Sequence, residues 1–320
     1  MTRVFEPPNL AEIRGARERI RGIAIRTPLV RLNADGPAEI WLKCENLQPI
    51  GSFKLRGAGN ALALAPPGSL ADGVYTASAG NMAQGVAWCA RRLGIRCSVV
   101  VPEHAPATKL AALERLGATV VKVPFDAWWR VITEHRYEGM SGFFVHPFAD
   151  PAVIAGNGTI GLEILEDLPD VDTILVPYGG GGLSSGIAAA AGAIDARVRV
   201  LACEVATAAP FTASLAAGRP ATVDYTPSFV DGIGSGNVLE EIWPLVSRLL
   251  KGSVVVAPEE AAAAVRLVAE RNRLIAEGAG AVPVAAALSG KAGGGKITCV
   301  LSGGNIDAAK LAAILSGQVP

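Results

Sequence analysis

The residue best suited to covalent chemistry in this 320-residue chain is Lys54, in the segment GSFKLRG at residues 51–57. It follows a proline-containing turn and opens a predicted helix. Partial burial and the positive end of a helix dipole both lower the pKa of an amine at such a place. A neutral amine can form an imine with a carbonyl compound. The alternative is an ordinary solvated lysine, since lysine side chains are mostly exposed.

A first loop that could bind an anion spans residues 76–85, TASAGNMAQG, between a predicted strand and a predicted helix. Free backbone N–H groups at the start of a helix attract negative charge and suit a carboxylate. The candidate contacts are Ser78, Ala79, Gly80, Asn81 and Met82. The loop could equally be a simple turn in which Asn81 caps the helix.

A second loop, VPYGGGGLSSG at residues 176–186, lies between a predicted buried strand and an alanine-rich helix. Its four consecutive glycines let the backbone approach an oxyanion closely, and the following helix dipole adds attraction, so a phosphate fits. They are Gly179, Gly180, Gly181 and Gly182. Their spacing is neither that of the dinucleotide-binding fingerprint nor that of a P-loop. The alternative is a flexible loop.

Two further polar residues could face the same ligand. Ser302 ends a predicted strand, and a hydroxyl at the carboxyl end of a parallel strand can reach a ligand in the crevice of the sheet. It could also be a turn residue. Glu277, in LIAEGAGA, is either a solvated charge at a helix end or a carboxylate facing this crevice.

The composition indicates an α/β protein that binds a small molecule. Hydrophobic residues make up 50% of the chain, and 29 basic residues balance 29 acidic ones, so no large basic face should attract nucleic acid or an anionic membrane. Five scattered cysteines form no metal-binding pattern and indicate reduced thiols. No apolar run reaches the roughly 18–20 residues of a membrane span, and no signal peptide is recognised. We expect a cytoplasmic protein.

Short apolar runs rich in β-branched residues alternate with amphipathic stretches, which predicts βαβ units on parallel sheets. The predicted strands are 74–78, 97–102, 119–123, 142–146, 173–178, 198–204 and 297–302. The predicted helices between them include 81–94, 107–117 and 257–272, the first two ending at a glycine suited to a C-cap.

The chain has no low-complexity linker, so any domain division must be by insertion or continuous packing. The segments at 65–68 (APPG) and 146–151 (HPFADP) are the candidate boundaries. They predict a large domain made of residues 1–70 and 148–320, with a small βαβ domain, residues 71–147, inserted in it.

Taken in order, these segments resemble the fold-type II pyridoxal-phosphate enzymes, specifically the branch of threonine/serine dehydratases and serine racemases. The resemblance is collinear over nearly the whole chain. Its segments are RTPLVR (26–31), GSFKLRGA (51–58), SAGNMAQGVA (78–87), HPFADPAVIAGNGTIGLEI (146–164), GGGGL (179–183) and LSGGN (301–305). It implies the tryptophan-synthase-β-like fold, in which the large domain binds pyridoxal 5'-phosphate and the small one closes over the substrate.

The resemblance also implies roles for the candidate residues. Lys54 would be the Schiff-base lysine, Phe53 would lie against the cofactor ring, and Asn81 would bond the ring hydroxyl. The four glycines would hold the phosphate, with Glu277 also on the cofactor side. Ser302 would bond the pyridine nitrogen; as a neutral partner it does not keep the ring protonated, which favours elimination over transamination.

The implied reaction is α,β-elimination from a β-hydroxy amino acid such as threonine, serine, hydroxyaspartate or a bulkier analogue. Residues 78–82 would hold the substrate carboxylate and orient the α-C–H bond. Lys54 would remove the α-proton, the β-hydroxyl would leave, and the released enamine would hydrolyse to a 2-keto acid and ammonia. We therefore expect an ammonia-lyase of amino-acid metabolism.

Other activities on the same fold remain open. Racemase-like relatives carry an acid/base serine where this chain has Ala79, which favours a lyase, although the neighbouring Ser78 stays a candidate catalytic residue. Relatives usually have histidine in place of Met82, so substrate preference could differ. A β-replacement synthase would usually show a threonine-rich carboxylate loop. A non-catalytic binding protein would have little reason to retain this set of residues.

Three further expectations concern a cation, two tryptophans and assembly. Some relatives bind a cation through a glutamate matching Glu204, but Pro210 stands where an aspartate is expected, so a divalent or monovalent cation is possible and no metal is predicted. Trp128 and Trp129 either pack under a helix or form an apolar wall for a bulky β-substituent. The resemblance alone implies a homodimer.

Overall fold

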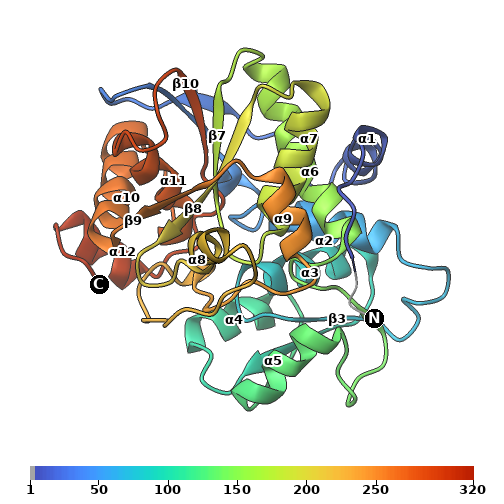
Figure 1. The fold of residues 1–320 in the computed structure, drawn as a ribbon. Coiled ribbons are helices and arrows are strands. Elements are labelled where there is room, and N and C mark those ends of the chain that lie inside the picture. The colour runs from blue at the N-terminus through green and yellow to red at the C-terminus, as the bar shows by residue number, and fades with distance from the viewer. Residues whose placement is uncertain (1–3) are drawn as a thin grey trace.

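Two separate β-sheets, each flanked by helices, form the protein (Figure 1). The computed structural model describes residues 4–320. In Figure 1 the larger sheet occupies the upper part of the molecule, and the smaller sheet lies below it with α4 and α5. The predicted α/β class with two parallel-type sheets is confirmed.

The larger sheet has six strands in the order β1-β2-β10-β7-β8-β9. Only β1 pairs antiparallel with its neighbour; the other four pairings are parallel. The strands are β1 (Leu29–Arg31), β2 (Glu39–Lys43), β7 (Thr173–Pro177), β8 (Arg199–Val205), β9 (Ser253–Val256) and β10 (Lys296–Val300).

Helices cover both faces of this sheet, which explains why its central strands are continuously apolar. In β7, Leu175 belongs to the core cluster under α10 and α11, whereas Ile174 and Val176 belong to the cluster under α6 and α7. These helices are α6 (Pro151–Asp167), α7 (Gly182–Ile194), α10 (Pro258–Asn272) and α11 (Gly278–Leu288).

The smaller sheet has four parallel strands in the order β5-β4-β3-β6. They are β3 (Val74–Ala77), β4 (Cys97–Pro102), β5 (Thr119–Val123) and β6 (Phe143–Phe144). One face packs on α2, α3 and α4 and the other on α5. These helices are α2 (Lys54–Ala63), α3 (Asn81–Leu93), α4 (Ala107–Arg115) and α5 (Phe125–Glu134).

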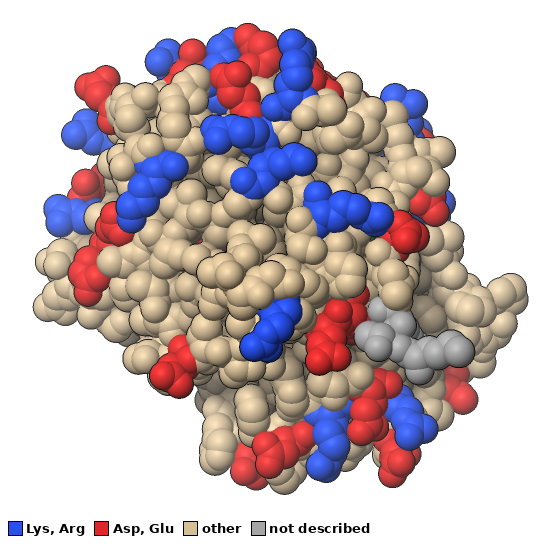
Figure 2. All heavy atoms as spheres, in the orientation of Figure 1, with Lys and Arg blue, Asp and Glu red and all other residues tan. Residues whose placement is uncertain are grey.

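The remaining helices complete the large-sheet layers and the connections. They are α1 (Leu10–Arg19), α8 (Pro210–Ala217), α9 (Trp243–Leu249) and α12 (Ala308–Leu315), with short 3-10 turns η1 (Glu45–Leu47) and η2 (Asp231–Ile233). No helix among residues 4–320 combines the length and apolar character that crossing a membrane requires. Basic and acidic side chains are interspersed on the face shown in Figure 2, without a continuous patch of one sign.

All seven predicted strands and all three predicted helices are present, with small shifts at their ends. Gly94 caps α3 in the left-handed conformation as expected, with φ at 68°. In α4 the cap is Leu116, and Gly117 follows it with φ at 83°. The domain boundaries stay a prediction, and residues 1–3 of the predicted large domain lie outside the described residues. Helix α2, assigned there to the large domain, packs its apolar side chains against the small sheet.

A buried charge cluster lies beneath the start of α2. The Arg56 guanidinium bonds Glu45 at 2.8 Å and Glu163 at 2.7 Å, and Lys43 Nζ bonds Glu163 at 2.6 Å. All four side chains are almost completely buried. Two cations and two carboxylates therefore balance one another, and the cluster joins α2 to β2, η1 and α6.

Replacing Arg56 with methionine should lower the free energy of unfolding by about 3–5 kcal/mol, because two buried carboxylates would lose their shared partner. Urea unfolding followed by tryptophan fluorescence measures the change. The matched control is Arg248→Met, since Arg248 pairs with Glu6 on the surface, where such pairs contribute at most about 1 kcal/mol. Equal stability of the two variants would contradict a structural role for the cluster.

Candidate active site

One cavity of about 370 Å³ is lined by every residue that the sequence predicted for the cofactor and substrate site. It lies at the carboxyl ends of strands from both sheets, where ligands of open α/β sheets bind. The nominated residues in its lining are Phe53, Lys54, Ser78, Ala79, Gly80, Asn81, Met82, Gly179, Gly180, Gly181, Gly182, Glu277 and Ser302. Their placement supports a common site; their individual roles stay predictions.

Lys54, the first residue of α2, directs its amine into the protein. Its Nζ donates a hydrogen bond to the Pro147 carbonyl at 2.9 Å and lies 5.1 Å from the centre of the Phe53 ring. Burial lowers the pKa of Lys54 to about 8, against a smaller opposing effect of the Glu277 charge. The alternative of a solvated surface lysine is therefore wrong.

The glycine loop is packed tightly, so the alternative of a flexible loop is also wrong. A Cβ on Gly180 would lie 2.2 Å from the Phe148 ring, and one on Gly182 would lie 2.4 Å from the Phe148 carbonyl oxygen. Gly181 has φ at 84°, which disfavours other residues. Helix α7 begins at Gly182, so its free N–H groups lie beside the loop.

Residues 76–85, which we call the carboxylate loop after their predicted role, run from the end of β3 into α3. Gly80 caps the helix, and its backbone N–H donates to Ser78 Oγ at 3.2 Å. Asn81 is the first helical residue, so the alternative in which it caps the helix is wrong. The Met82 side chain is buried in the small-sheet core, which leaves its backbone to face the cavity.

Glu277 and Asn81 form a polar pair within the cavity. Asn81 Nδ2 donates to Glu277 Oε1 at 2.8 Å, and Asn81 Oδ1 accepts from Asn305 Nδ2 at 2.8 Å. Burial, reinforced by the negative charge of Asp231, raises the pKa of Glu277 to about 7. Glu277 is only 9% exposed, so it is not a solvated helix-end charge.

Ser302 lies just beyond the end of β10 with its side chain buried at the cavity. Its carbonyl accepts a hydrogen bond from the Phe53 N–H at 3.0 Å, which ties the end of the strand to the start of α2. The interpretation as a mere turn residue does not account for its position at the cavity beside Lys54.

Two aspects of this site fit a phosphorylated carbonyl cofactor. The loop from Gly179 to Gly182 offers a cradle without side chains, and the buried Tyr178 and Ser185 hydroxyls near it have no partner in the described structure. The Lys54 amine, neutral at mildly alkaline pH, suits imine formation with an aldehyde. Fold and site together define an enzyme that holds such a cofactor at the junction of two α/β layers.

Comparison with known families agrees with that class. Residues 20–303 match the family model described as pyridoxal-phosphate dependent enzyme. The chain belongs to this family, within the group that contains threonine dehydratases and serine racemases, and its cofactor is pyridoxal 5'-phosphate.

Characterised relatives resemble the chain over most of its length. It is 43% identical to the L-threonine ammonia-lyase of Geobacter sulfurreducens, over 95% of this chain and 77% of that protein. It is 37% identical to the catabolic L-threonine dehydratase of Escherichia coli, over 96% of each. Maize serine racemase superposes with a TM-score of 0.89 at 32% identity, covering 97% of this chain and 98% of that one.

Glu204, for which the sequence left a cation possible, is fully engaged by the chain. Its carboxylate accepts hydrogen bonds from the Phe211 N–H at 2.8 Å, from the Thr212 N–H at 2.8 Å and hydroxyl at 2.6 Å, and from the Ser253 hydroxyl at 2.9 Å. Helix α8 begins at Pro210, so its N-terminus approaches the carboxylate. Four donors therefore surround these two oxygens.

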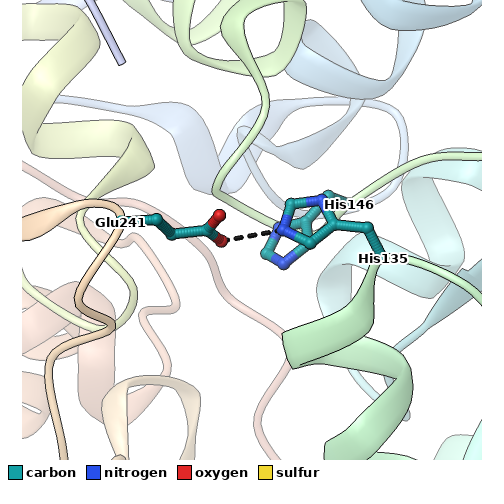
Figure 3. Close-up of side chains that lie close together, drawn as sticks. All are labelled: His135, His146 and Glu241. Carbon is teal, nitrogen blue, oxygen red and sulfur yellow. Dashed lines mark hydrogen bonds and ion pairs between the residues drawn. The ribbon is translucent and has the colours of Figure 1, made fainter. Parts of the chain in front are cut away.

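His135, His146 and Glu241 form a second polar cluster (Figure 3). The His146 ring contacts that of Phe148, which lines the cavity. The rings of His135 and His146 stack with centres 4.3 Å apart, and His135 Nε2 bonds Glu241 at 2.8 Å. His146 Nδ1 accepts from the Phe148 and Ala149 N–H groups, while its Nε2 contacts the Ile132 carbonyl. Because both ring nitrogens of His146 form hydrogen bonds with the backbone, we interpret the cluster as a structural contact rather than a metal centre.

Sequence reasoning missed several residues that shape the site. Phe148 packs against the glycine loop, Pro147 accepts the bond from Lys54, and Lys109 pairs with Asp231 at 2.9 Å across the lining. The segment 146–151 was noted only as a boundary and a family match. Its HPF sequence could have suggested a packed aromatic, but nothing in the sequence indicates that Lys109 and Asp231 meet.

The shifted pKa of Lys54 predicts how the cofactor-depleted protein captures pyridoxal phosphate. Only the neutral amine reacts, so the capture rate should rise about tenfold per pH unit below 8 and level off above it. Stopped-flow absorbance of the visible cofactor band measures the rate. In Glu277→Gln the plateau should begin at lower pH, because the negative charge that raises the pKa of Lys54 is gone. A rate still climbing toward pH 10 in the unaltered protein would show an ordinary lysine.

Proposed function

We propose that this protein is an ammonia-lyase that converts a β-hydroxy amino acid such as L-threonine to a 2-keto acid and ammonia. The observation that carries the proposal is the Lys54 amine, with a pKa near 8, in one cavity with both anion-binding loops. Similarity to threonine ammonia-lyases and dehydratases over almost the whole chain supports it.

In this proposal the carboxylate loop binds and orients the amino acid. The N–H groups at the start of α3 and the Ser78 hydroxyl would bind the substrate carboxylate. Residues 78–82 line the cavity, and the first N–H groups of a helix have no hydrogen-bond partner within the helix. The substrate α-carbon then lies toward Lys54. Orientation of this kind contributes to rate by presenting the α-C–H bond to the base.

Lys54 is the proposed base. Its burial keeps a sizeable fraction of the amine neutral near physiological pH, so it can accept the α-proton, which is finally lost with the β-hydroxyl as water. The Pro147 carbonyl, already 2.9 Å from Nζ, can accept a hydrogen bond from the resulting ammonium. Bound pyridoxal phosphate supplies an electron-withdrawing ring that stabilises negative charge at the α-carbon.

The cofactor-holding residues are proposed from the same geometry. Gly179 to Gly182 would hold the phosphate, Phe53 would lie against the ring, and Ser302 would bond the ring nitrogen. Asn81 would bond the ring hydroxyl with the amide hydrogen that Glu277 leaves available, since Nδ2 carries two. The Asn305 bond to Asn81 Oδ1 fixes that amide in the required orientation.

A racemase is the alternative function, and one observation favours it: Ser78 lines the cavity in a chain that superposes closely on a serine racemase. Ala79, where racemase-like relatives carry serine, favours the lyase. We also propose a cytosolic homodimer. All five cysteines are buried and unpaired, which suits a reducing compartment; membership of the family is the support for the dimer.

The direct test is turnover. The purified holoenzyme should form keto acid from at least one of L-threonine, L-serine, threo-3-hydroxyaspartate and phenylserine, with Lys54→Ala losing both this activity and the visible band of the bound cofactor. Chiral chromatography of the remaining amino acid serves as the control for racemisation. A visible band with an inverted amino acid and no keto acid would assign the racemase activity instead.

The surroundings of Glu204 predict that activity needs no added cation, because a metal would have to displace donors that already satisfy the carboxylate. Treatment with EDTA, or exchange of K⁺ for tetramethylammonium, should change kcat by less than about twofold, because the Glu204 carboxylate keeps its hydrogen-bond partners without a metal. A drop of tenfold or more that Mg²⁺, Ca²⁺ or K⁺ restores would overturn this prediction.

A further inference from the structure

Helix α5 presents an aromatic face to the cavity. Phe125, Trp128, Trp129 and Ile132 all line it, at the i, i+3, i+4 and i+7 spacing of one helix face. The charged residues Asp126, Arg130 and Glu134, spaced at i, i+4 and i+8, are exposed on the other side. The helix is therefore amphipathic with its apolar face toward the cavity. We call this face the aromatic wall.

The aromatic wall continues onto the large-sheet side of the cavity. Trp128 and Trp129 belong to one hydrophobic cluster with Phe148 and Leu239, and both of these residues also line the cavity. Phe148 is the residue packed against the glycine loop. The same cluster includes Ala77, which immediately precedes the carboxylate loop. The wall thus reaches from one anion-binding loop to the other.

No charged group of α5 faces this part of the cavity. The charged residues of the lining are Lys54, Lys109, Asp231 and Glu277. Lys54 and Glu277 belong to the polar side already described, and Lys109 and Asp231 neutralise each other in a 2.9 Å ion pair. A ligand group that lies against the wall therefore meets rings and alkyl chains and no unpaired charge.

Core packing alone does not account for these aromatic side chains. Both tryptophans are half-buried, and Phe125, whose ring centre lies 5.5 Å from that of Trp128, is 57% exposed. Exposed apolar surface is unfavourable in water, and a concave group of aromatic residues is a usual feature of a binding site for an apolar ligand group. Threonine would place only a methyl group against this wall.

We propose that the preferred substrate is a β-hydroxy amino acid whose β-carbon carries a bulky apolar group, such as a phenyl ring, and that the aromatic wall binds this group. The inference rests on the proposed lyase function and names the substrate class of the same site. Held by its carboxylate at residues 78–82 with its α-carbon toward Lys54, the substrate has its β-substituent beside Trp128 and Trp129.

The reaction balances for such a substrate without an oxidant or reductant. With phenylserine, the α-proton and the β-hydroxyl leave as water, and an enamine forms. Hydrolysis of the enamine takes up one water and releases ammonia, giving phenylpyruvate. The net change is loss of ammonia, as with threonine, so only the β-substituent distinguishes the two substrates.

The test compares L-threo-phenylserine with L-threonine. Even one methylene in an apolar pocket is worth about 10–200-fold, so kcat/KM should favour phenylserine at least about tenfold. In Trp129→Ala and Trp128→Ala this preference should fall at least about fivefold, because the phenyl group loses its contact with an indole ring. The matched control is Trp88→Ala, since Trp88 is a half-buried tryptophan of α3 that stacks with Arg92 and does not line the cavity.

Binding without turnover gives an independent measurement. L-Phenylalanine and L-alanine lack the β-hydroxyl, so they can bind but cannot eliminate water, and their titration against the visible cofactor band gives dissociation constants. Phenylalanine should bind about tenfold or more tightly than alanine, and Trp129→Ala should remove most of that difference. Trp129→Phe, which keeps an aromatic ring, serves where the alanine variant is unstable, and should retain the preference.

The outcomes separate the two proposals. Keto acid from threonine with no preference for phenylserine, or a preference that the tryptophan variants leave unchanged, overturns the aromatic-wall inference and leaves the lyase standing. Tighter phenylalanine binding that depends on Trp129, with no keto acid from any hydroxy amino acid, supports the wall and overturns the lyase.

Discussion

The position of Lys54 depends on the buried charge cluster formed by Lys43, Glu45, Arg56 and Glu163. Arg56 lies two residues after Lys54, within the first turn of α2, and its guanidinium contacts both carboxylates. Because buried charges tolerate little displacement from their partners, the first turn of α2 is held relative to η1 and α6. The cluster thus holds the first turn of α2, and with it Lys54, in place. A permanent ion pair with the Lys54 amine itself would stabilise the charged form and raise its pKa.

Close helix packing supplies the second constraint. A Cβ on Gly156 of α6 would lie 2.5 Å from the Arg56 carbonyl, and one on Gly186 of α7 would lie 2.3 Å from the Ile154 carbonyl. Glycine at these contacts lets α2, α6 and α7 approach backbone to backbone. The lysine at the start of α2 and the glycine loop at the start of α7 are therefore positioned through α6, whose own N-terminus follows Phe148.

Sequence patterns predicted much of this arrangement and failed where contacts depend on chain segments far apart. Strands buried on both faces gave clear apolar runs, as in β7, whereas β1, β2 and β9, which are only partly buried, were not predicted. The glycine loop and Lys54 were recognisable because few structural roles need those residues. For Glu277 the alternatives stayed open, because its burial results from contacts with Asn81, 196 positions earlier in the chain. The same limit hid the pairing of Lys109 with Asp231.

The two sheets contribute different parts of the cavity lining. The polar groups that would hold the cofactor come mainly from the large-sheet side: the end of β7, the end of β10 and Glu277 at the start of α11. The small sheet supplies the carboxylate loop after β3 and, through α5, the aromatic wall. In the proposed function, the carboxylate and the β-substituent of the amino acid would thus both be bound by the same layer. Substitutions on α5 can change the preferred substituent without moving Lys54, because α5 packs on the face of the small sheet opposite to α2.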